Sequence, residues 1–207
     1  MKNIFDQYWK RYDAWYDNHR FAYLSEVEVI KKVLPRKGNG LEIGVGTGRF
    51  ASALGIPDGI DPSVKMAAIA KSHGINVKIG KGENLPYKDR EFDYILIAIT
   101  ICFVKNSEKV ISEAKRVLKN KGKIILGIVD KDSFLGKFYR QKKSPFYKEA
   151  KFFSVKEVTA LLRKTGFNRF SFWQTIFHLP EKIQAIETPI KGYRKGGFVV
   201  ISGYKRN

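Results

Sequence analysis

The segment LEIGVGTGRF, residues 41–50, constrains the fold more than any other part of this chain. An apolar run leads into the spaced glycines Gly44, Gly46 and Gly48, and helix-forming residues follow at once. This is the order of a buried strand, a tight turn and a helix, in which glycine lets the backbone pass close to a ligand at the carboxyl edge of a sheet. The segment therefore predicts a ligand site at the end of a first strand.

Short apolar runs alternate with helical stretches along the rest of the chain. We expect strands near residues 39–44, 57–61, 75–79, 92–99, 122–129, 168–175 and 197–205, with helices beginning near residues 47, 63, 107 and 154. Strands joined by helical crossovers form a mainly parallel sheet covered on both faces. The pattern predicts an α/β protein with a doubly wound, seven-stranded, mainly parallel sheet and helices on both faces.

The remaining segments fit around that sheet. Residues 1–34 predict two helices that form an N-terminal helical cap, the first of them rich in aromatic residues. Segments 131–151 and 178–196 look like insertions beside the sheet. A chain of 207 residues is of single-domain size, so we expect one domain over residues 1–207.

Composition excludes several classes of protein. No stretch approaches the roughly 18 apolar residues of a membrane-spanning helix, and charge interrupts every turn of the first residues, so we expect no signal peptide, no membrane span and a cytoplasmic protein. The single cysteine, Cys102, excludes an internal disulfide framework and a multi-cysteine metal site. We therefore expect no metal.

Positive charge is concentrated in the second half of the chain. The net charge is +19, and residues 101–207 carry 24 basic and 8 acidic side chains. Such an excess attracts nucleic acid, anionic lipid or an acidic substrate, but it is also typical of a solvated lysine-rich surface. Charge alone leaves these alternatives open.

Two further residues bear on the ligand. A dinucleotide fingerprint requires a third glycine at position 49, where this chain has Arg49, so the pattern argues against NAD. Asp61 ends the second expected strand, where a carboxylate can accept both hydroxyls of a ribose. An ordinary tight turn and a helix N-cap would explain the glycines and Asp61 singly, but their spacing together favours a nucleoside site.

These motifs, with others in the same order, resemble the class I S-adenosylmethionine-dependent methyltransferases, particularly the small-molecule branch of ubiquinone and menaquinone biosynthesis (type 11 domain). The resemblance covers nearly the whole chain through LEIGVGTGRF, GIDPS, GENLPYKDREFD (82–93), ILIAITICFV (95–104), RVLKNKGKIILG (116–127) and FFSVKEVTALLRKTGF (152–167). It implies a Rossmann-like fold, S-adenosylmethionine as cofactor and S-adenosylhomocysteine as product.

The resemblance also implies roles for particular residues. Glu42 would hold the cationic amino end of the methionyl group, and Asp61 would hold the ribose. The full cofactor-binding set that it implies is Glu42, Gly44, Gly46, Gly48, Asp61, Pro62, Met66, Gly82, Glu83, Asn84, Ile99 and Thr100. Lys81 stands where many relatives carry an acidic residue, so an adenine contact from that position is not expected.

The methyl acceptor is less constrained. No Asp/Asn-Pro-Pro-Tyr motif follows the fourth expected strand, and no proline precedes Cys102, which disfavours two patterns of nucleic-acid base methylation. His19, His178 and Tyr16 are the candidate catalytic residues. We expect methyl transfer by in-line displacement to a small molecule, either anionic or amine-bearing. The alternative is an RNA- or protein-directed methyltransferase that docks through its basic second half, although the sequence disfavours nucleic acid. A third hypothesis is a nucleoside-binding regulatory module without enzymatic activity.

Overall fold

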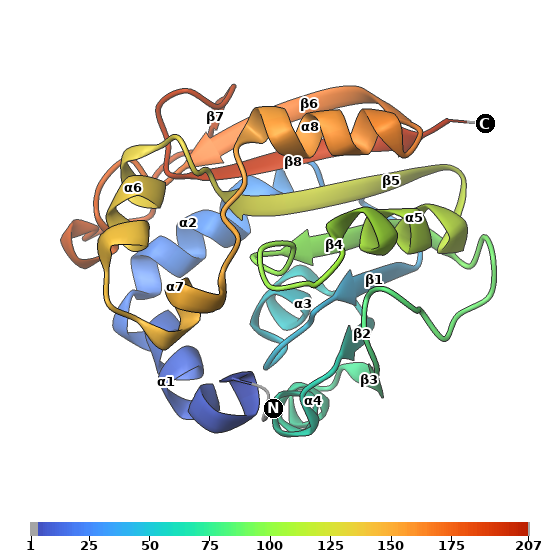
Figure 1. The fold of residues 1–207 in the computed structure, drawn as a ribbon, viewed down its shortest axis with the longest axis horizontal. Helices are drawn as coiled ribbons and strands as arrows, with labels where there is room; N and C mark the ends of the chain where they lie inside the picture. The colour runs from blue at the N-terminus through green and yellow to red at the C-terminus, as the bar shows by residue number, and fades with distance from the viewer. Residues whose placement is uncertain (1–3, 207) are drawn as a thin grey trace.

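Eight strands form one sheet in this computed structural model, which describes residues 4–206. They are β1 (Gly40–Ile43), β2 (Asp58–Asp61), β3 (Asn76–Ile79), β4 (Phe92–Ala98), β5 (Leu118–Val129), β6 (Phe167–Thr175), β7 (Ile190–Lys191) and β8 (Phe198–Lys205). Their order across the sheet is β3-β2-β1-β4-β5-β8-β6-β7 (Figure 1). The first five strands run parallel, and β8 pairs antiparallel with both β5 and β6. The predicted α/β fold with a doubly wound, mainly parallel sheet is confirmed.

Strand periodicity divides the core into two layers. In β4, Tyr94 and Leu96 point into one hydrophobic cluster, whereas Ile95 and Ile97 point into the other. Successive side chains of a strand alternate between faces, so each apolar strand supplies both layers. The first layer packs under α2 (Arg20–Lys31), α3 (Arg49–Leu54) and α4 (Val64–Ser72), and the second under α5 (Ser107–Val117) and α8 (Val155–Lys164).

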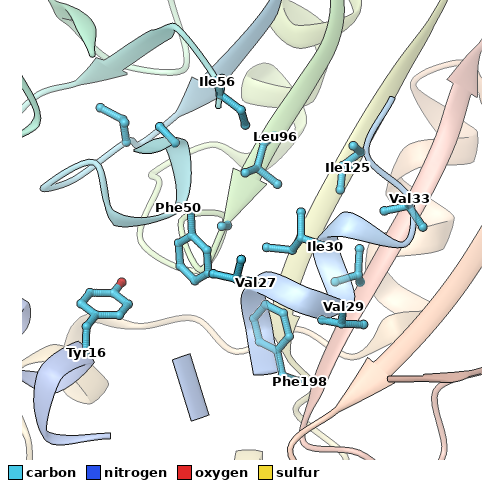
Figure 2. Packing of buried hydrophobic residues seen from close by; sticks show 14 of the residues in the cluster. Tyr16, Val27, Val29, Ile30, Val33, Phe50, Ile56, Leu96, Ile125 and Phe198 are labelled. Carbon is cyan, nitrogen blue, oxygen red and sulfur yellow. The ribbon is translucent and has the colours of Figure 1, made fainter. Parts of the chain in front are cut away.

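Helix α2 supplies much of the first layer. Figure 2 shows Val27 and Ile30 of this helix between Phe50, Leu96 and Phe198. Removing apolar side chains of this size from water stabilises a fold by about 1.5–3 kcal/mol each. The second predicted helix of the N-terminal cap is therefore part of the core.

Side-chain caps mark where the helices begin. The Ser63 hydroxyl accepts a hydrogen bond from the Met66 amide at 3.2 Å at the start of α4. Ser154 and Glu157 form a reciprocal capping box at the start of α8, and Asn106 caps α5. These caps satisfy amide groups that have no partner within the helix.

The structure corrects two details of the expected sheet. It contains an eighth strand, β7, which lies within segment 178–196, expected to be only an insertion, and pairs with Trp173 and Gln174 of β6. Strand β5 also begins at Leu118 rather than near residue 122. A two-residue edge strand leaves no periodic pattern in sequence, so the first difference arises from pairing that only the folded chain allows.

Four elements gather beyond the carboxyl ends of β4 and β5 (Figure 1). They are α1 (Ile4–Asn18), α6 (Phe134–Gln141), α7 (Pro145–Glu149) and the 3-10 turn η1 (Pro180–Lys182). Segment 131–151 thus contains two short helices. Across residues 4–206, no helix is long and apolar enough to cross a membrane.

Candidate active site

The glycine loop after β1 folds back onto β2. The amides of Gly44 and Val45 donate to the Ile60 carbonyl at 2.8 and 3.1 Å. Gly44 has a φ of 71°, and a Cβ added there would lie 2.2 Å from Cγ2 of Thr100. Only glycine meets both conditions, a left-handed backbone and direct contact with the end of β4.

Asp61 joins the ends of the first two strands. Its Oδ2 accepts a hydrogen bond from the Gly46 amide at 2.9 Å, and its Oδ1 accepts one from the Ser63 amide at 2.8 Å. Burial raises the pKa of Asp61, although these two amides oppose the shift. Each carboxylate oxygen has capacity for a further donor. The Asp61 side chain therefore links the loop after β1 to the end of β2, the two strand ends that the sequence predicts to lie together.

Glu42 is a buried carboxyl group, one oxygen of which lacks a donor among the described residues. Its side chain is 1% exposed, and Oε2 has no hydrogen-bond partner among the described residues. Burial raises the pKa of Glu42 well above its ordinary value, with the Ala51 amide opposing the shift. An orphaned carboxyl beside the glycine loop is a site for a positively charged ligand group, because a buried charge is stable only when paired.

Helix α1 lies over both of these loops. Asp13 accepts a hydrogen bond from the Thr47 hydroxyl at 2.6 Å, and Asp6 accepts one from the Ser63 hydroxyl at 2.5 Å. The ring of Tyr12 lies 3.8 Å from the position that a Cβ on Gly46 would occupy. The predicted N-terminal cap therefore contacts both loops at the strand ends where a nucleoside ligand is expected.

A cavity of about 330 Å³ adjoins this covered region at the end of β4. It extends between the N-terminal helices and the α6–α7 segment, and most of its wall is aromatic or aliphatic. The residues lining it are Arg11, Tyr12, Trp15, Tyr16, His19, Glu26, Ile99, Ile101, Cys102, Phe103, Ile128, Val129, Tyr139, Lys142, Lys143, Ser144, Phe146, Tyr147, Ala150, Phe152, Phe153 and Glu181. Its shape and lining are those of a small-molecule site.

Glu26 is a cavity residue that the sequence reasoning missed. It belongs to α2, is 3% exposed, and its Oε2 has no hydrogen-bond partner in residues 4–206. Burial raises the pKa of Glu26 to about 8. One signal could have revealed it, because Glu26 is four residues from both Ala22 and Ile30, two fully buried residues of the same helix. A carboxyl group on the apolar face of a helix is exceptional.

Three predicted cofactor residues make contacts within the protein. Met66 is 1% exposed at the start of α4. A Cβ on Gly82 would lie 2.8 Å from the Ile43 side chain, so Gly82 permits close packing there. Glu83 accepts hydrogen bonds from the amides of Lys105 and Asn106 at 3.0 and 3.3 Å. Their roles toward a cofactor stay predictions.

The other predicted cofactor residues fall into two groups. Pro62 and Asn84 are exposed, and each lies in the loop that follows a strand, β2 and β3 respectively. Ile99 lines the cavity. The Thr100 hydroxyl lies within hydrogen-bond distance of two backbone carbonyl oxygens, that of Ala98 at 2.9 Å and that of Gly44 at 3.1 Å. Ile99 and Thr100 therefore lie between the glycine loop and the cavity.

The candidate catalytic residues separate in space. Tyr16 and His19 line the cavity; the Tyr16 hydroxyl lies 2.7 Å from that of Tyr12, and the His19 ring stacks on Trp15. Burial raises the pKa of Tyr16 well above its ordinary value, so this phenol stays protonated. His178 is not among the described residues that line the cavity.

His178 and Cys102 can also be placed. His178 is exposed, and its Nδ1 lies 2.6 Å from Oε1 of Glu187. Cys102 lines the cavity, but burial raises the pKa of its thiol to about 12, and a thiol in that state is a poor nucleophile.

The doubly wound sheet and the glycine loop after its first strand agree with the family resemblance seen in the sequence. The chain belongs to the class I S-adenosylmethionine-dependent methyltransferases. Residues 41–126 match a methyltransferase domain family. The cofactor is S-adenosylmethionine, whose sulfonium carries an activated methyl group, and the product is S-adenosylhomocysteine.

Two relatives match the chain over its full length or nearly so, and a third matches about half of it. A crystal structure from Thermotoga maritima, described as that of an S-adenosylmethionine-dependent methyltransferase and possible histamine N-methyltransferase, has a TM-score of 0.97, 49% identity and complete coverage of both chains. An uncharacterized protein of Methanocaldococcus jannaschii is 52% identical over 98% of this chain and 99% of its own length. The demethylmenaquinone methyltransferase of Thermotoga maritima is 35% identical over 55% of this chain and 53% of its own.

Proposed function

We propose that this methyltransferase transfers the methyl group of S-adenosylmethionine to a small molecule bound in the cavity beyond Ile99. The observation that carries the proposal is the cavity itself, about 330 Å³ and lined mainly by aromatic and aliphatic side chains. That volume lies in the range typical of small-ligand pockets, roughly 300–1,000 Å³.

For the cofactor, we assign roles to the residues that surround the glycine loop. Glu42 would pair with the amino group of the methionyl moiety, since its Oε2 has no protein donor among the described residues. Asp61 would accept the ribose hydroxyls with the lone pairs that Gly46 and Ser63 leave free. Pro62 and Asn84 are exposed along the expected adenine side. Ile99 and Thr100 would lie near the sulfonium.

The protein's task in methyl transfer is alignment. An in-line displacement requires the acceptor atom at about 3 Å from the methyl carbon and opposite the sulfur. Helix α1 and the aromatic walls of the cavity would exclude water and restrict the orientation of the acceptor. When the acceptor must lose a proton, His19 is the candidate base, because it lines the cavity and has an imidazole ring.

The relatives support a small acceptor. The Thermotoga maritima protein of 49% identity is described as a possible histamine N-methyltransferase, and a second relative from that organism is a demethylmenaquinone methyltransferase. Both substrates are small molecules, and the first carries an amine. These names support an amine-bearing acceptor as one candidate for this chain.

An RNA- or protein-directed activity is the alternative, and one observation favours it. The segment around α6 and α7 carries basic side chains close to aromatic ones, with Lys142 4.3 Å from the ring centroid of Phe138. Its exposed cations are Lys137, Arg140, Lys142, Lys143, Lys148 and Lys151. Cations interleaved with aromatic rings are typical of single-strand nucleic-acid surfaces.

Transfer of labelled methyl groups tests the two functions side by side. The protein is incubated with methyl-labelled S-adenosylmethionine and either a library of small metabolites that includes histamine, or total RNA, or unmodified protein. We expect label in the small-molecule fraction. Label confined to RNA, together with RNA binding that persists at physiological salt, would replace this proposal with an RNA-directed activity. Label confined to protein would replace it with a protein-directed one.

A further inference from the structure

Glu26 is the polar group at the inner wall of the acceptor cavity that the cofactor site does not explain. It lies on α2, whereas the glycine loop follows β1 and Asp61 ends β2. Its side chain is buried, lines the cavity, and has an Oε2 without a partner among the described residues. A buried carboxyl group left in this state costs stability, so its position calls for a ligand.

Aromatic rings line the same cavity as this carboxyl group. Burial, with a smaller contribution from the charge of Glu26, raises the pKa of Tyr16, Tyr139 and Tyr147. The rings of Tyr139 and Tyr147 stack at 4.7 Å between centroids, and Trp15 lines the same cavity. Electron-rich ring faces around a carboxylate favour a cation with apolar substituents over a neutral or anionic group.

Charge is distributed along the cavity with opposite signs. The exposed charged residues that line it are three cations, Arg11, Lys142 and Lys143, and one carboxylate, Glu181, so positive charge is in excess there, whereas Glu26 is 3% exposed. A cationic group of the acceptor is therefore repelled by the exposed cations and attracted to the buried carboxyl group. This arrangement orients the acceptor with its positive end inward.

Resting on the function proposed above, we propose that the methyl acceptor carries a cationic nitrogen and that Glu26 is the residue that binds it, with the rings of Trp15 and Tyr139 beside it. The acceptor class is a small primary or secondary amine with an apolar or aromatic body. Glu26 thereby becomes a specificity-determining residue for the acceptor.

The empty and occupied cavities differ in the protonation of Glu26. With its pKa raised to about 8, the carboxyl group is mostly neutral at pH 7. An ammonium group beside it favours the carboxylate, so binding releases about one proton to solvent. The other titratable or charged groups that line the cavity are Arg11, Tyr12, Tyr16, His19, Cys102, Tyr139, Lys142, Lys143, Tyr147 and Glu181.

Ligand binding to matched variants tests the proposal. With S-adenosylhomocysteine present, calorimetry measures the affinity of 2-phenylethylamine, tryptamine and histamine, and of the alcohol that corresponds to each. The proteins are the wild type, Glu26→Gln, and Glu28→Gln as control. Glu28 lies on the same helix but pairs with Lys31 at the surface, away from the cavity.

We expect at least one amine to bind the wild type more tightly than its alcohol. Glu26→Gln should lower that affinity at least about tenfold, the loss typical of a hydrogen bond to a charged group, while Glu28→Gln changes it less than twofold. Titrations in buffers of different ionisation enthalpy should show proton release with the wild type and not with Glu26→Gln. Because His19 and the tyrosines are retained in both proteins, that difference isolates Glu26.

Two results would overturn the inference: no amine preferred over its alcohol, or equal amine affinity in the wild type and Glu26→Gln. Binding of S-adenosylhomocysteine and methyl transfer to the metabolite library are measured on the same proteins. If small molecules without a cationic group are methylated, and Glu26→Gln methylates them equally well, only the inference fails. If no small molecule is methylated, the proposed function fails.

Discussion

Arg49 clamps Asp13 through two parallel hydrogen bonds, from Nε to Oδ1 at 2.9 Å and from Nη2 to Oδ2 at 2.7 Å. The same guanidinium also binds Asp17 one turn further along α1. Arg49 occupies the position where a dinucleotide-binding loop has its third glycine. In this chain Arg49 instead holds the N-terminal helix over the glycine loop, so the residue that argues against NAD in the sequence has a structural role here.

This clamp predicts unequal roles for two aspartates of α1. Asp13 is 20% exposed and also accepts a hydrogen bond from Thr47, whereas Asp17 is 67% exposed. Asp13→Ala should lower the free energy of unfolding by about 1–3 kcal/mol, and Asp17→Ala by less than about 1 kcal/mol, because exposed ion pairs contribute little. Urea unfolding measures both, and amide exchange should quicken over residues 4–18 in Asp13→Ala. Equal losses in the two variants would contradict the clamp.

Alanine substitutions at two glycines with similar backbone conformation test how closely the glycine loop approaches the end of β4. Gly44 and Gly55 have φ values of 71° and 67°, but an added Cβ meets Thr100 at Gly44 and nothing within 4 Å at Gly55. Gly55→Ala should cost about 1–2 kcal/mol for backbone strain alone. Gly44→Ala should cost more and should abolish measurable binding of S-adenosylhomocysteine. Thermal unfolding and calorimetry provide the two readouts, and equal stability of the variants would argue against this approach.

Removal of the Asp61 carboxyl group should weaken binding of the cofactor through its ribose. Asp61→Ala should weaken S-adenosylhomocysteine binding by about 1.5–3 kcal/mol, the range for hydrogen bonds to a charged group. The matched control is Asp58→Ala at the start of the same strand, where the carboxyl group binds the Asn76 side chain at 2.6 Å. That control should bind the cofactor product normally in calorimetric titration. If Asp61→Ala binds S-adenosylhomocysteine with wild-type affinity, Asp61 does not bind the ribose and only joins the backbone amides of Gly46 and Ser63.

Glu26 predicts how stability depends on pH. Its pKa is about 8 in the folded protein and near 4.5 in the unfolded chain, so the unfolded state loses its proton first as pH rises. The contribution of protonated Glu26 to the free energy of unfolding is fully present below pH 4.5. It is lost progressively, by about a few kcal/mol, as pH rises through about 8. Glu42, whose pKa is also raised, contributes in the same direction.

Replacing Glu26 should flatten that dependence. Urea unfolding of the wild type between pH 5.5 and 8.5 should show stability falling with pH, and Glu26→Gln should show a shallower slope because the titrating group is gone while Glu42 remains. At pH 8.5 the variant should be the more stable of the two, since an amide avoids the cost of burying a charge. Identical slopes would mean that Glu26 is not a buried, unpaired carboxyl group in solution.

The proximity of the main residues of the candidate cofactor site could be predicted from the sequence. Gly44, Gly46 and Asp61 stand at the ends of apolar runs, and the carboxyl ends of neighbouring parallel strands meet at one edge of a sheet. Their proximity therefore follows from local pattern and topology. The seven longer strands and the main helices were predictable for the same reason, because periodicity is a local property.

The acceptor side depended on contacts between distant segments. Glu26 and Glu28 are similar in sequence, yet packing of α2 against the sheet turns one carboxyl group into the cavity and leaves the other at the surface. The rings that accompany Glu26 come from Trp15 and Tyr139, more than a hundred residues apart. His19 and His178 were equal candidates, and only the folded chain places His19 in the cavity and His178 beside Glu187. Burial and pairing of this kind are set by tertiary packing, because the energy of a charged side chain depends on which segments surround it.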